Sequence, residues 1–372
     1  MPAEPAMPAA MPAARPCEVA IVGDHFMLPA AFERALRDAC QERVRVRSLT
    51  LPWPDQPMRH GYAVPGLDGL PGLEGLPGLE GLKEYQGDPE RIVEFVADAE
   101  VLVTQLAPVS AAMLDRMARL RLIAVARGGP VNIDLAAARA RGVRVVNTPG
   151  RNASAVAEFT IGAILAETRR IRAGHEALRG GQWRGDLYRA DRAGRELSEM
   201  TVGVIGYGQV GTRVVRLLKA FGGAILVADP YVQLSATDRA DGVRHVRLED
   251  LLARSDVVSL HARLTAETAG LLGRAQFAAM RPGSYFVNTA RGPMVDYAAL
   301  HDALASDRLA GAMLETFAIE PAPPDWPLLK LPNVTLTPHI AGASVRTITL
   351  AAAAAAEEVR RHLAGEPPLN AC

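Results

Sequence analysis

The sequence predicts an α/β protein with two domains, each built on an open parallel sheet. Three observations predict this class. Apolar, strand-like runs alternate with helical patterns in both halves of the chain, as in parallel sheets covered by helices. A glycine-rich turn, Gly206–Gly211, lies between a strand pattern and a helix pattern near the middle. The length of 372 residues is ample for two domains.

Residues 17–147 contain the first alternation. The run CEVAIVG, from Cys17, has the composition of a buried strand, and we expect the ordered chain to begin there, after a proline-interrupted tail at 1–16 that makes a poor signal peptide. The periodicity predicts strands at 17–23, 44–51, 101–105, 122–126 and 143–147, and helices at 29–40, 88–99, 110–120 and 135–141. This part should therefore form a sheet of its own.

A Pro/Gly-rich segment at 52–87 interrupts that alternation. Glycine recurs there at every third position from Gly66 to Gly81, which is the period of collagen. Six triplets with only two prolines, inside a globular chain, are a poor basis for a triple helix. We favour a repeat expansion in a surface loop.

The second alternation begins after Pro149-Gly150. A helix is predicted from about Ser154 to Gly174, with apolar residues on more than one face, so that it could bridge domains or subunits. A polar, arginine-rich excursion follows at 180–194, with Trp183 as its expected anchor. The pattern then predicts strands at 202–205, 224–228, 257–261, 284–290, 309–315 and 331–339, and helices at 212–221, 273–280, 297–306 and 344–364.

The turn after the strand at 202–205 reads G-x-G-x-x-G. Gly206 permits the sharp turn, Gly208 lets the backbone approach a pyrophosphate, and Gly211 lets helix and strand pack closely. The helix N-terminus adds unpaired amides and a positive dipole end. Asp229 lies 18 residues after Gly211, at the end of the next strand, where an acid can bind the adenine ribose. Together these features predict a Rossmann-type dinucleotide site.

Composition narrows the partners. Lys+Arg and Asp+Glu are both 41, so net charge indicates neither nucleic acid nor a membrane surface. No apolar run approaches 18 residues, which predicts no membrane span. Cys17, Cys40 and Cys372 are scattered, so they predict neither a disulfide framework nor a metal site, and they fit a reducing compartment such as the cytoplasm.

Three polar features lie at predicted strand ends, where ligands bind in open α/β sheets. Arg291 could form two hydrogen bonds with a carboxylate, or it could be an ordinary surface arginine. His339 could be a general acid/base or a buried, satisfied histidine. Glu320 could pair with the second nitrogen of His339 or be a solvated loop acid, and sequence spacing does not decide between these.

These residues complete a set of motifs that resembles the D-isomer-specific 2-hydroxyacid dehydrogenase family. The resemblance covers roughly residues 17–365. Its markers, in family order, are NTPGRNASAVAE, TVGVIGYGQVG, VADPY, SLHARLTAET, NTARG, the pair Glu320-Pro321, and TPHIAG. It implies hydride transfer between C4 of nicotinamide and C2 of a 2-hydroxy or 2-oxo acid, with NAD as cofactor.

The resemblance assigns roles residue by residue. It implies that Arg291 binds the substrate carboxylate and polarises the carbonyl, that His339 is the proton donor and acceptor, and that Glu320 is its partner. The loop around Arg127, Gly128 and Gly129 would also hold the substrate. The expected cofactor-binding residues are Gly206, Tyr207, Gly208, Gln209, Val210, Gly211, Asp229, Thr289, Ala290 and His339. Because Asp229 would repel the 2′-phosphate of NADP, we expect NAD to be preferred.

The resemblance also implies an architecture. A cofactor domain at about 148–341 would be inserted into a substrate domain formed by 17–147 plus 342–372, with a cleft between them, and the helix from Ser154 would be a homodimer helix. Some relatives are instead NAD-sensing corepressors that keep the same three residues. This alternative stays open, although the chain ends at Cys372, soon after the last predicted helix, and no regulatory domain is expected.

The chain departs from the family pattern in three places. Val131 stands where the substrate loop usually has Asp, Arg263 stands where Pro is common, and Glu315 stands where Asp is usual. One hypothesis is that Arg127 binds a second anionic group of the substrate. The alternative is that this arginine has a structural role, as most arginines do not bind ligands. Glu320, in place of the Gln of formate dehydrogenases, argues against formate as the substrate.

Overall fold

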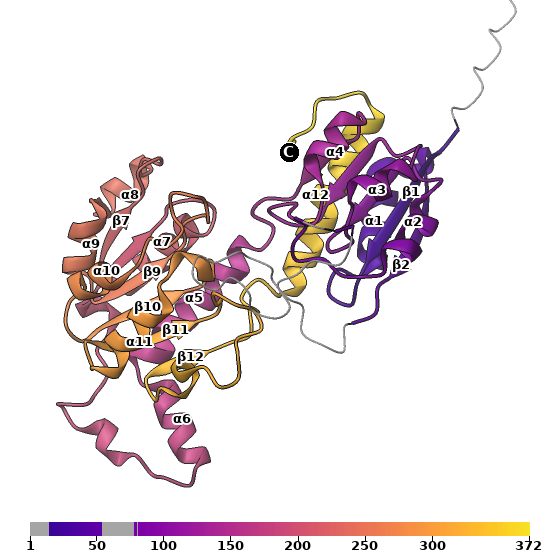
Figure 1. Cartoon of the computed structure of the whole chain (residues 1–372). Coiled ribbons are helices and arrows are strands. Elements are labelled where there is room, and N and C mark those ends of the chain that lie inside the picture. The colour runs from indigo at the N-terminus through magenta and orange to yellow at the C-terminus, as the bar shows by residue number, and fades with distance from the viewer. Residues whose placement is uncertain (1–14, 54–77, 80) are drawn as a thin grey trace, which may run out of the picture. The chain divides into compact units, whose positions relative to one another are not determined.

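The computed structural model describes residues 15–53, 78–79 and 81–372, and it contains two compact units. Unit 1 comprises Tyr85–Pro149 and Ile348–Cys372 together with the described residues up to Trp53. Unit 2 comprises Gly150–Thr347 together with residues 78–79 and 81–84. Figure 1 shows that each unit carries its own sheet, which confirms the predicted fold class.

Unit 1 is built on a five-stranded parallel sheet with the order β2-β1-β3-β4-β5. This is the flavodoxin-like order, in which the chain reverses direction across the sheet beside β1. The strands are β1 Cys17–Gly23, β2 Val44–Thr50, β3 Val101–Thr104, β4 Leu122–Val125 and β5 Arg144–Asn147.

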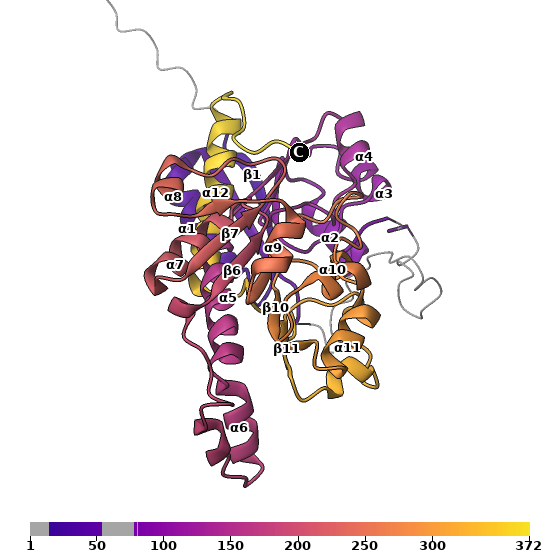
Figure 2. The same ribbon diagram turned by 90° about the vertical axis from the view of Figure 1, so that its left-hand side faces the viewer.

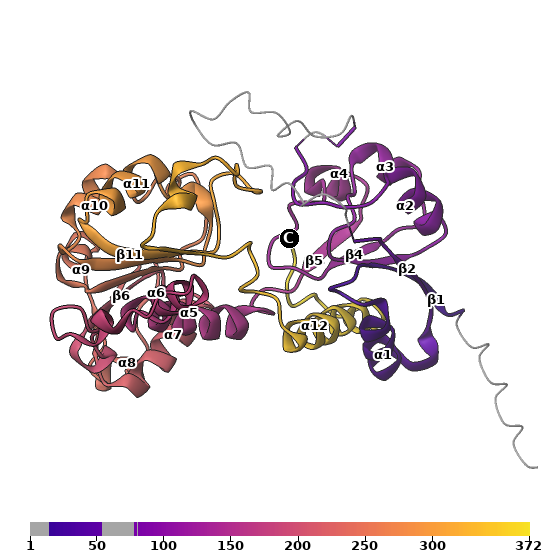
Figure 3. The same ribbon diagram turned by 90° about the horizontal axis from the view of Figure 1, so that it is seen from below.

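Helices cover the sheet of unit 1. They are α1 Pro29–Cys40, α2 Pro89–Val96, α3 Ala111–Asp115, α4 Leu135–Ala140 and the C-terminal α12 Val345–Leu363. Alanines of α12 share one apolar cluster with Phe32 and Leu36 of α1, and Figures 1 and 3 show the two helices side by side. The last residues reach β5, where the Cys372 amide donates to the Val145 carbonyl at 3.0 Å. Both ends of the described chain therefore contribute to one sheet domain.

Unit 2 is built on a seven-stranded parallel sheet with the order β12-β11-β10-β9-β6-β7-β8. Numbered from β6, this is the doubly wound order 3-2-1-4-5-6 with one further strand, and its switch point lies between β6 and β9. The strands are β6 Thr201–Ile205, β7 Ala224–Ala228, β8 Arg244–His245, β9 Val257–Leu260, β10 Ser284–Asn288, β11 Leu309–Leu314 and β12 Val334–Leu336.

Neighbouring strand residues of unit 2 belong to different cores. Val204 and Val287 pack in one apolar cluster with residues of α5 and α7, whereas Ile205 and Phe286 pack in another with residues of α9, α10 and α11. Both faces are therefore covered, as an all-parallel sheet requires. The helices are α5 Ala153–Thr168, α6 Ile171–Arg179, α7 Gly211–Leu218, α8 Ala236–Ala240, α9 Leu248–Arg254, α10 Arg274–Ala279 and α11 Tyr297–Ala305.

Three sequence-based expectations differ from the structure. The helix expected at 154–174 is two helices, because Arg170 adopts a left-handed conformation with φ 59° between α5 and α6. Trp183 is 86% exposed, so it anchors nothing within the chain that the structure describes. The elements α8, β8 and α9 were not predicted. Figure 2 shows α6 and the segment after it projecting away from the sheet.

Some expectations lie outside the described residues. These are most of the tail at 1–16 and most of the glycine repeat within the 52–87 segment. Among the described helices, none combines the length and the apolarity that crossing a bilayer requires.

Candidate active site

The glycine turn connects β6 to α7 at the switch point of the unit 2 sheet. Gly206 has φ 92°, and a Cβ there would lie 2.6 Å from the Ala262 amide nitrogen. A Cβ on Gly211 would lie 2.0 Å from the Gly206 carbonyl oxygen. Gly208, in contrast, has no described atom within 4 Å of a Cβ position, so its backbone is open to a ligand. The turn thus has the shape that a pyrophosphate needs.

Asp229 follows β7 beside this turn. One carboxylate oxygen accepts from the Tyr207 amide at 2.8 Å, and the other accepts from the Tyr231 and Val232 amides at 2.9 and 3.0 Å. These three bonds fix the carboxylate at the strand end, where an adenine ribose would lie. The Tyr207 hydroxyl donates to the carboxylate of Asp238, which ties the glycine turn to α8.

Of the remaining predicted residues of the turn, Gln209 is exposed and Val210 is half-buried. Val210 is the N-cap residue of α7. The Gln209 side chain accepts from Arg213 at 2.9 Å, and its Oε1 lies 3.1 Å from a Cβ position on Gly150. The Gln209 side chain therefore lies beside Gly150, the residue at which the chain enters unit 2.

His339 and Glu320 are in direct contact. His339 follows β12, and its Nδ1 lies 2.7 Å from Oε2 of Glu320. The other Glu320 oxygen accepts from the Phe317 amide at 2.8 Å, so the acid is held on both sides. The Glu320 side chain is only 10% exposed and that of His339 26%. The interpretation of Glu320 as a solvated loop acid is therefore wrong, and the acid orients the imidazole.

Arg291 follows β10, which is separated from β12 only by β11 in the sheet. Asn288 holds the loop by accepting from the Ala290 amide at 3.0 Å. A Cβ on Gly292 would lie 1.8 Å from the Phe317 carbonyl oxygen, so the loop packs directly on the segment that carries Glu320. Thr289 is buried, with its hydroxyl 2.9 Å from that of Thr160. The predicted residues at the ends of β10 and β12 therefore share one edge of the sheet.

Glu315, at the end of β11, is a buried acid that the sequence indicated only as a departure from the family pattern. It is 1% exposed and accepts from the Ala341 amide at 2.6 Å. Burial raises its pKa to about 7, opposed in part by the charges of His339 and Arg291. The His339 amide donates to the Glu315 carbonyl at 3.0 Å, so this acid lies beside the residue proposed to carry the proton.

The predicted substrate loop lies in unit 1, at the carboxyl end of β4. The Arg127 carbonyl accepts from the Thr148 amide at 3.0 Å, and the Gly128 carbonyl accepts from the Asn147 side chain at 2.9 Å. Cβ positions on Gly128 and Gly129 meet no described atom within 4 Å. The backbone of this loop is therefore anchored at one end and open along the glycines.

No group of three or more His, Cys, Asp or Glu side chains suited to a metal ion occurs within residues 15–53, 78–79 and 81–372. The side chains described above at the carboxyl ends of β10, β11 and β12 are Arg291, Glu315, Glu320 and His339. Such a set can transfer a proton and bind a carboxylate.

Comparison with known proteins agrees with this chemistry. A family model described as "D-isomer specific 2-hydroxyacid dehydrogenase, NAD binding domain" matches residues 161–341. The chain is 39% identical over 280 residues to the glyoxylate reductase of Korarchaeum cryptofilum, covering 75% of this chain and 84% of that protein. It is 38% identical over 280 residues to D-3-phosphoglycerate dehydrogenase of Mycobacterium tuberculosis, but this match covers only 52% of that longer enzyme.

A solved structure has a similar fold over almost the whole chain. The TT0316 protein from Thermus thermophilus aligns with a TM-score of 0.74 and 30% identity, over 95% of this chain and 99% of that chain. The open glycine turn of unit 2 fits the dinucleotide that the family model names. The chain therefore belongs to the D-isomer-specific 2-hydroxyacid dehydrogenase family and is an NAD-dependent D-2-hydroxyacid dehydrogenase.

Proposed function

We propose that His339, Glu320 and Arg291 catalyse the interconversion of a 2-oxo acid and its D-2-hydroxy acid. The observation that carries this proposal is the 2.7 Å contact between His339 Nδ1 and Glu320 Oε2. Because Nδ1 is engaged by the acid, Nε2 is the nitrogen that exchanges a proton with substrate. Arg291, at the end of β10, binds the substrate carboxylate through a bidentate pair of hydrogen bonds.

The proton steps follow from this arrangement. In reduction, His339 donates a proton from Nε2 to the substrate carbonyl oxygen as negative charge develops there. In oxidation, the same nitrogen accepts the hydroxyl proton. The Glu320 carboxylate stabilises the imidazolium in both directions by accepting from Nδ1. Bound NADH supplies the hydride that reduces C2.

We propose that the glycine turn and Asp229 select NAD over NADP. The backbone from Gly206 to Gly211, with Thr289 and Ala290 across the switch point, binds the cofactor in unit 2. The fixed carboxylate of Asp229 accepts from the ribose hydroxyls and repels a 2′-phosphate. In unit 1, the backbone amides of Gly128 and Gly129 bind the substrate carboxylate, and Arg127 binds a second anionic group.

A homodimer and a cytoplasmic location complete the proposal. Ile171, Leu178, Trp183 and Tyr188 lie on the projecting segment of unit 2 and are 58%, 59%, 86% and 96% exposed. Apolar exposure of this extent supports burial against a second copy.

The cytoplasmic location is supported by the cysteines. The free thiols of Cys17 and Cys40, both buried, fit a reducing compartment.

A panel of 2-oxo acids tests the activity. NADH oxidation is followed by the loss of its near-ultraviolet absorbance with glyoxylate, hydroxypyruvate and a phosphorylated three-carbon 2-oxo acid. We expect turnover of at least one substrate. Tight NADH binding without turnover of any would instead support the sensor function. Comparing Arg127→Ala on singly and doubly charged substrates tests that residue, since equal losses on both would contradict its proposed role.

A further inference from the structure

A pocket of about 250 Å³ lies in unit 2 at the sheet edge opposite to the catalytic residues. Its wall includes Ala310 at the start of β11 and Asn333 just before β12. His339 follows the other end of β12, as Arg291 follows β10, so the sheet separates the pocket from the proposed active site. The α5–α6 junction and the projecting segment close the remaining sides.

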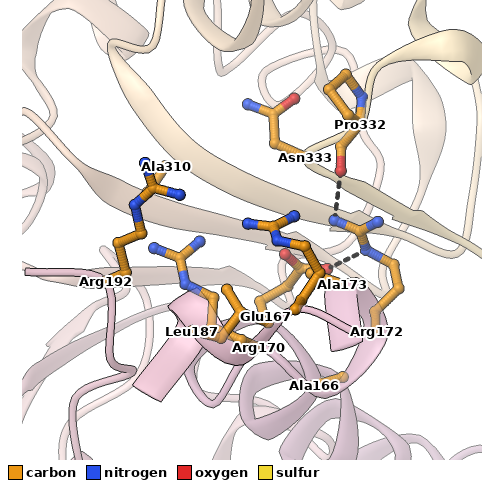
Figure 4. Close-up of a pocket in the computed structure, with 11 residues that line it drawn as sticks. Ala166, Glu167, Arg170, Arg172, Ala173, Leu187, Arg192, Ala310, Pro332 and Asn333 are labelled. Atoms are coloured by element: carbon orange, nitrogen blue, oxygen red, sulfur yellow. Dashed lines mark hydrogen bonds and ion pairs between the residues drawn. The ribbon is translucent and has the colours of Figure 1, made fainter. Parts of the chain in front are cut away.

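Four arginines line this pocket: Arg170, Arg172, Arg184 and Arg192. Figure 4 shows the labelled Arg192 and Arg172 on opposite sides of it. Among the described residues of the wall, Glu167 is the one carboxylate, and it is already engaged by Arg172 at 3.3 Å and by the Thr335 hydroxyl. A Cβ on Gly311 would lie 2.7 Å from the second Glu167 oxygen, so the acid is held against the sheet.

The surrounding acids do not neutralise the cluster. Asp186 accepts from Arg184 at 2.6 and 2.8 Å and from Arg192 at 2.5 Å, so one carboxylate serves two guanidinium groups. Glu176 accepts from Arg172 at 2.6 Å. Within the described residues, four guanidinium groups thus face three carboxylates, counting Glu167, which leaves an excess of positive charge at the pocket.

Arg170 is the cation that this network does not satisfy. Its backbone is left-handed, with φ 59°, which turns the residue out of the helical path between α5 and α6. Its Nε is buried and has no hydrogen-bond partner within the described structure. Buried donors in native proteins are nearly always paired, so this nitrogen indicates a missing acceptor.

We propose that this arginine pocket binds a small, multiply charged oxyanion of the phosphate class, separately from the active site. Guanidinium groups present planar pairs of donors that match phosphate oxygens, and several of them converging on one cavity favour an anion with more than one charge. Arg170 and Arg192 are the principal ligands, while Glu167 orients Arg172.

The test is a calorimetric titration of the full chain with inorganic phosphate. NADH is kept saturating to fill the glycine turn, and chloride keeps the ionic strength constant. We expect binding with a Kd of about 1 mM or tighter. Arg170→Ala and Arg192→Ala should each weaken it about tenfold or more, the usual contribution of a hydrogen bond to a charged group. Retained NADH affinity shows that each variant is folded.

Two further variants make the result decisive. Arg189 lies on the same segment but is exposed and pairs with Asp191 at 3.0 Å, so Arg189→Ala should leave phosphate affinity unchanged. If Arg291→Ala loses phosphate binding while Arg170→Ala retains it, the anion binds in the active site and the proposal is overturned. Absence of phosphate binding to the wild type would also overturn the proposal. A changed molecular mass of Arg170→Ala in solution would then favour an acidic segment of a second copy as the occupant of the pocket.

Discussion

Replacing Glu315 with glutamine should change how the stability of unit 2 depends on pH. The side chain is 1% exposed, and burial raises its pKa from 4.5 to about 7. Glutamine has nearly the same shape, and its side-chain oxygen can still accept from the Ala341 amide, as Glu315 does at 2.6 Å. Glu315→Gln therefore removes the titration while it preserves the packing.

The expected magnitude follows from the pKa difference. The folded protein keeps the Glu315 proton up to about pH 7, whereas the unfolded chain releases it near 4.5. The stability that the protonated carboxyl contributes is complete below pH 4.5 and is lost as the pH rises through 7. The difference corresponds to about 3 kcal/mol, at roughly 1.4 kcal/mol per pKa unit. Most of this loss falls between about pH 5 and 8 and should be absent in the variant.

Tryptophan fluorescence during urea unfolding can measure this loss within unit 2. The chain has three tryptophans, and Trp326 is the one near the site, with its ring centroid 5.1 Å from that of Tyr297. Trp53 and Trp183 are 58% and 86% exposed, so replacing both with phenylalanine should cost little stability. The remaining Trp326 signal then reports the unfolding free energy of unit 2 at each pH.

The comparison has a clear refuting result. Glu196→Gln changes an exposed acid of the same unit and should leave the pH dependence as in the parent. If Glu315→Gln and the parent lose the same free energy between about pH 5 and 8, then burial of Glu315 does not cost what its pKa implies, and the reasoning fails.

Three further predictions concern catalysis and cofactor binding. His339→Asn should lower kcat about 10²–10⁴-fold. Asparagine is chosen because it tolerates the left-handed backbone of this position, at φ 53°. An equal loss of NADH affinity in a fluorescence titration would indicate a structural role instead. Asp229→Asn removes charge but keeps an oxygen acceptor, so the kcat/KM ratio of NADH to NADPH should fall about tenfold or more, and an unchanged ratio would count against selection by charge. Gly206→Ala should abolish NADH binding and lower Tm, because its Cβ would lie 2.6 Å from the Ala262 amide. Gly222→Ala, at φ 77° with no described atom within 4 Å of a Cβ position, is its control and should cost only about 1–2 kcal/mol.

Much of the candidate site could be predicted because the carboxyl ends of parallel strands share one edge. Arg291 and His339 follow strands in the sequence, and the sheet order β10-β11-β12 brings those strand ends together. Their contacts could not be predicted in the same way. The pairing of Glu320 with His339 depends on a loop that leaves β11 and on the Phe317 amide that holds the acid, and neither has a periodic signal.

The misassigned elements have physical causes as well. The apolar pattern of residues 154–174 continues through the α5–α6 boundary, and no proline or glycine marks the break at Arg170. The environment of Glu315 is likewise set by tertiary packing. An apolar strand pattern predicts that its end is buried, but it does not predict which groups surround an acid there. Sequence periodicity indicates which positions are buried, but it does not show how a polar group there is satisfied.

The assignment of the C-terminal helix to unit 1 bears on the order in which the chain can fold during synthesis. All of Gly150–Thr347 leaves the ribosome before residues 348–372, so unit 2 can complete its sheet while the face of unit 1 that α12 covers is still bare. Val19 and Ile21 of β1 lie in the cluster that receives Ala352 and Ala356. The early-made strands of unit 1 must therefore wait for the last-made helix, and nascent chains stalled before it would expose an apolar surface that chaperones recognise.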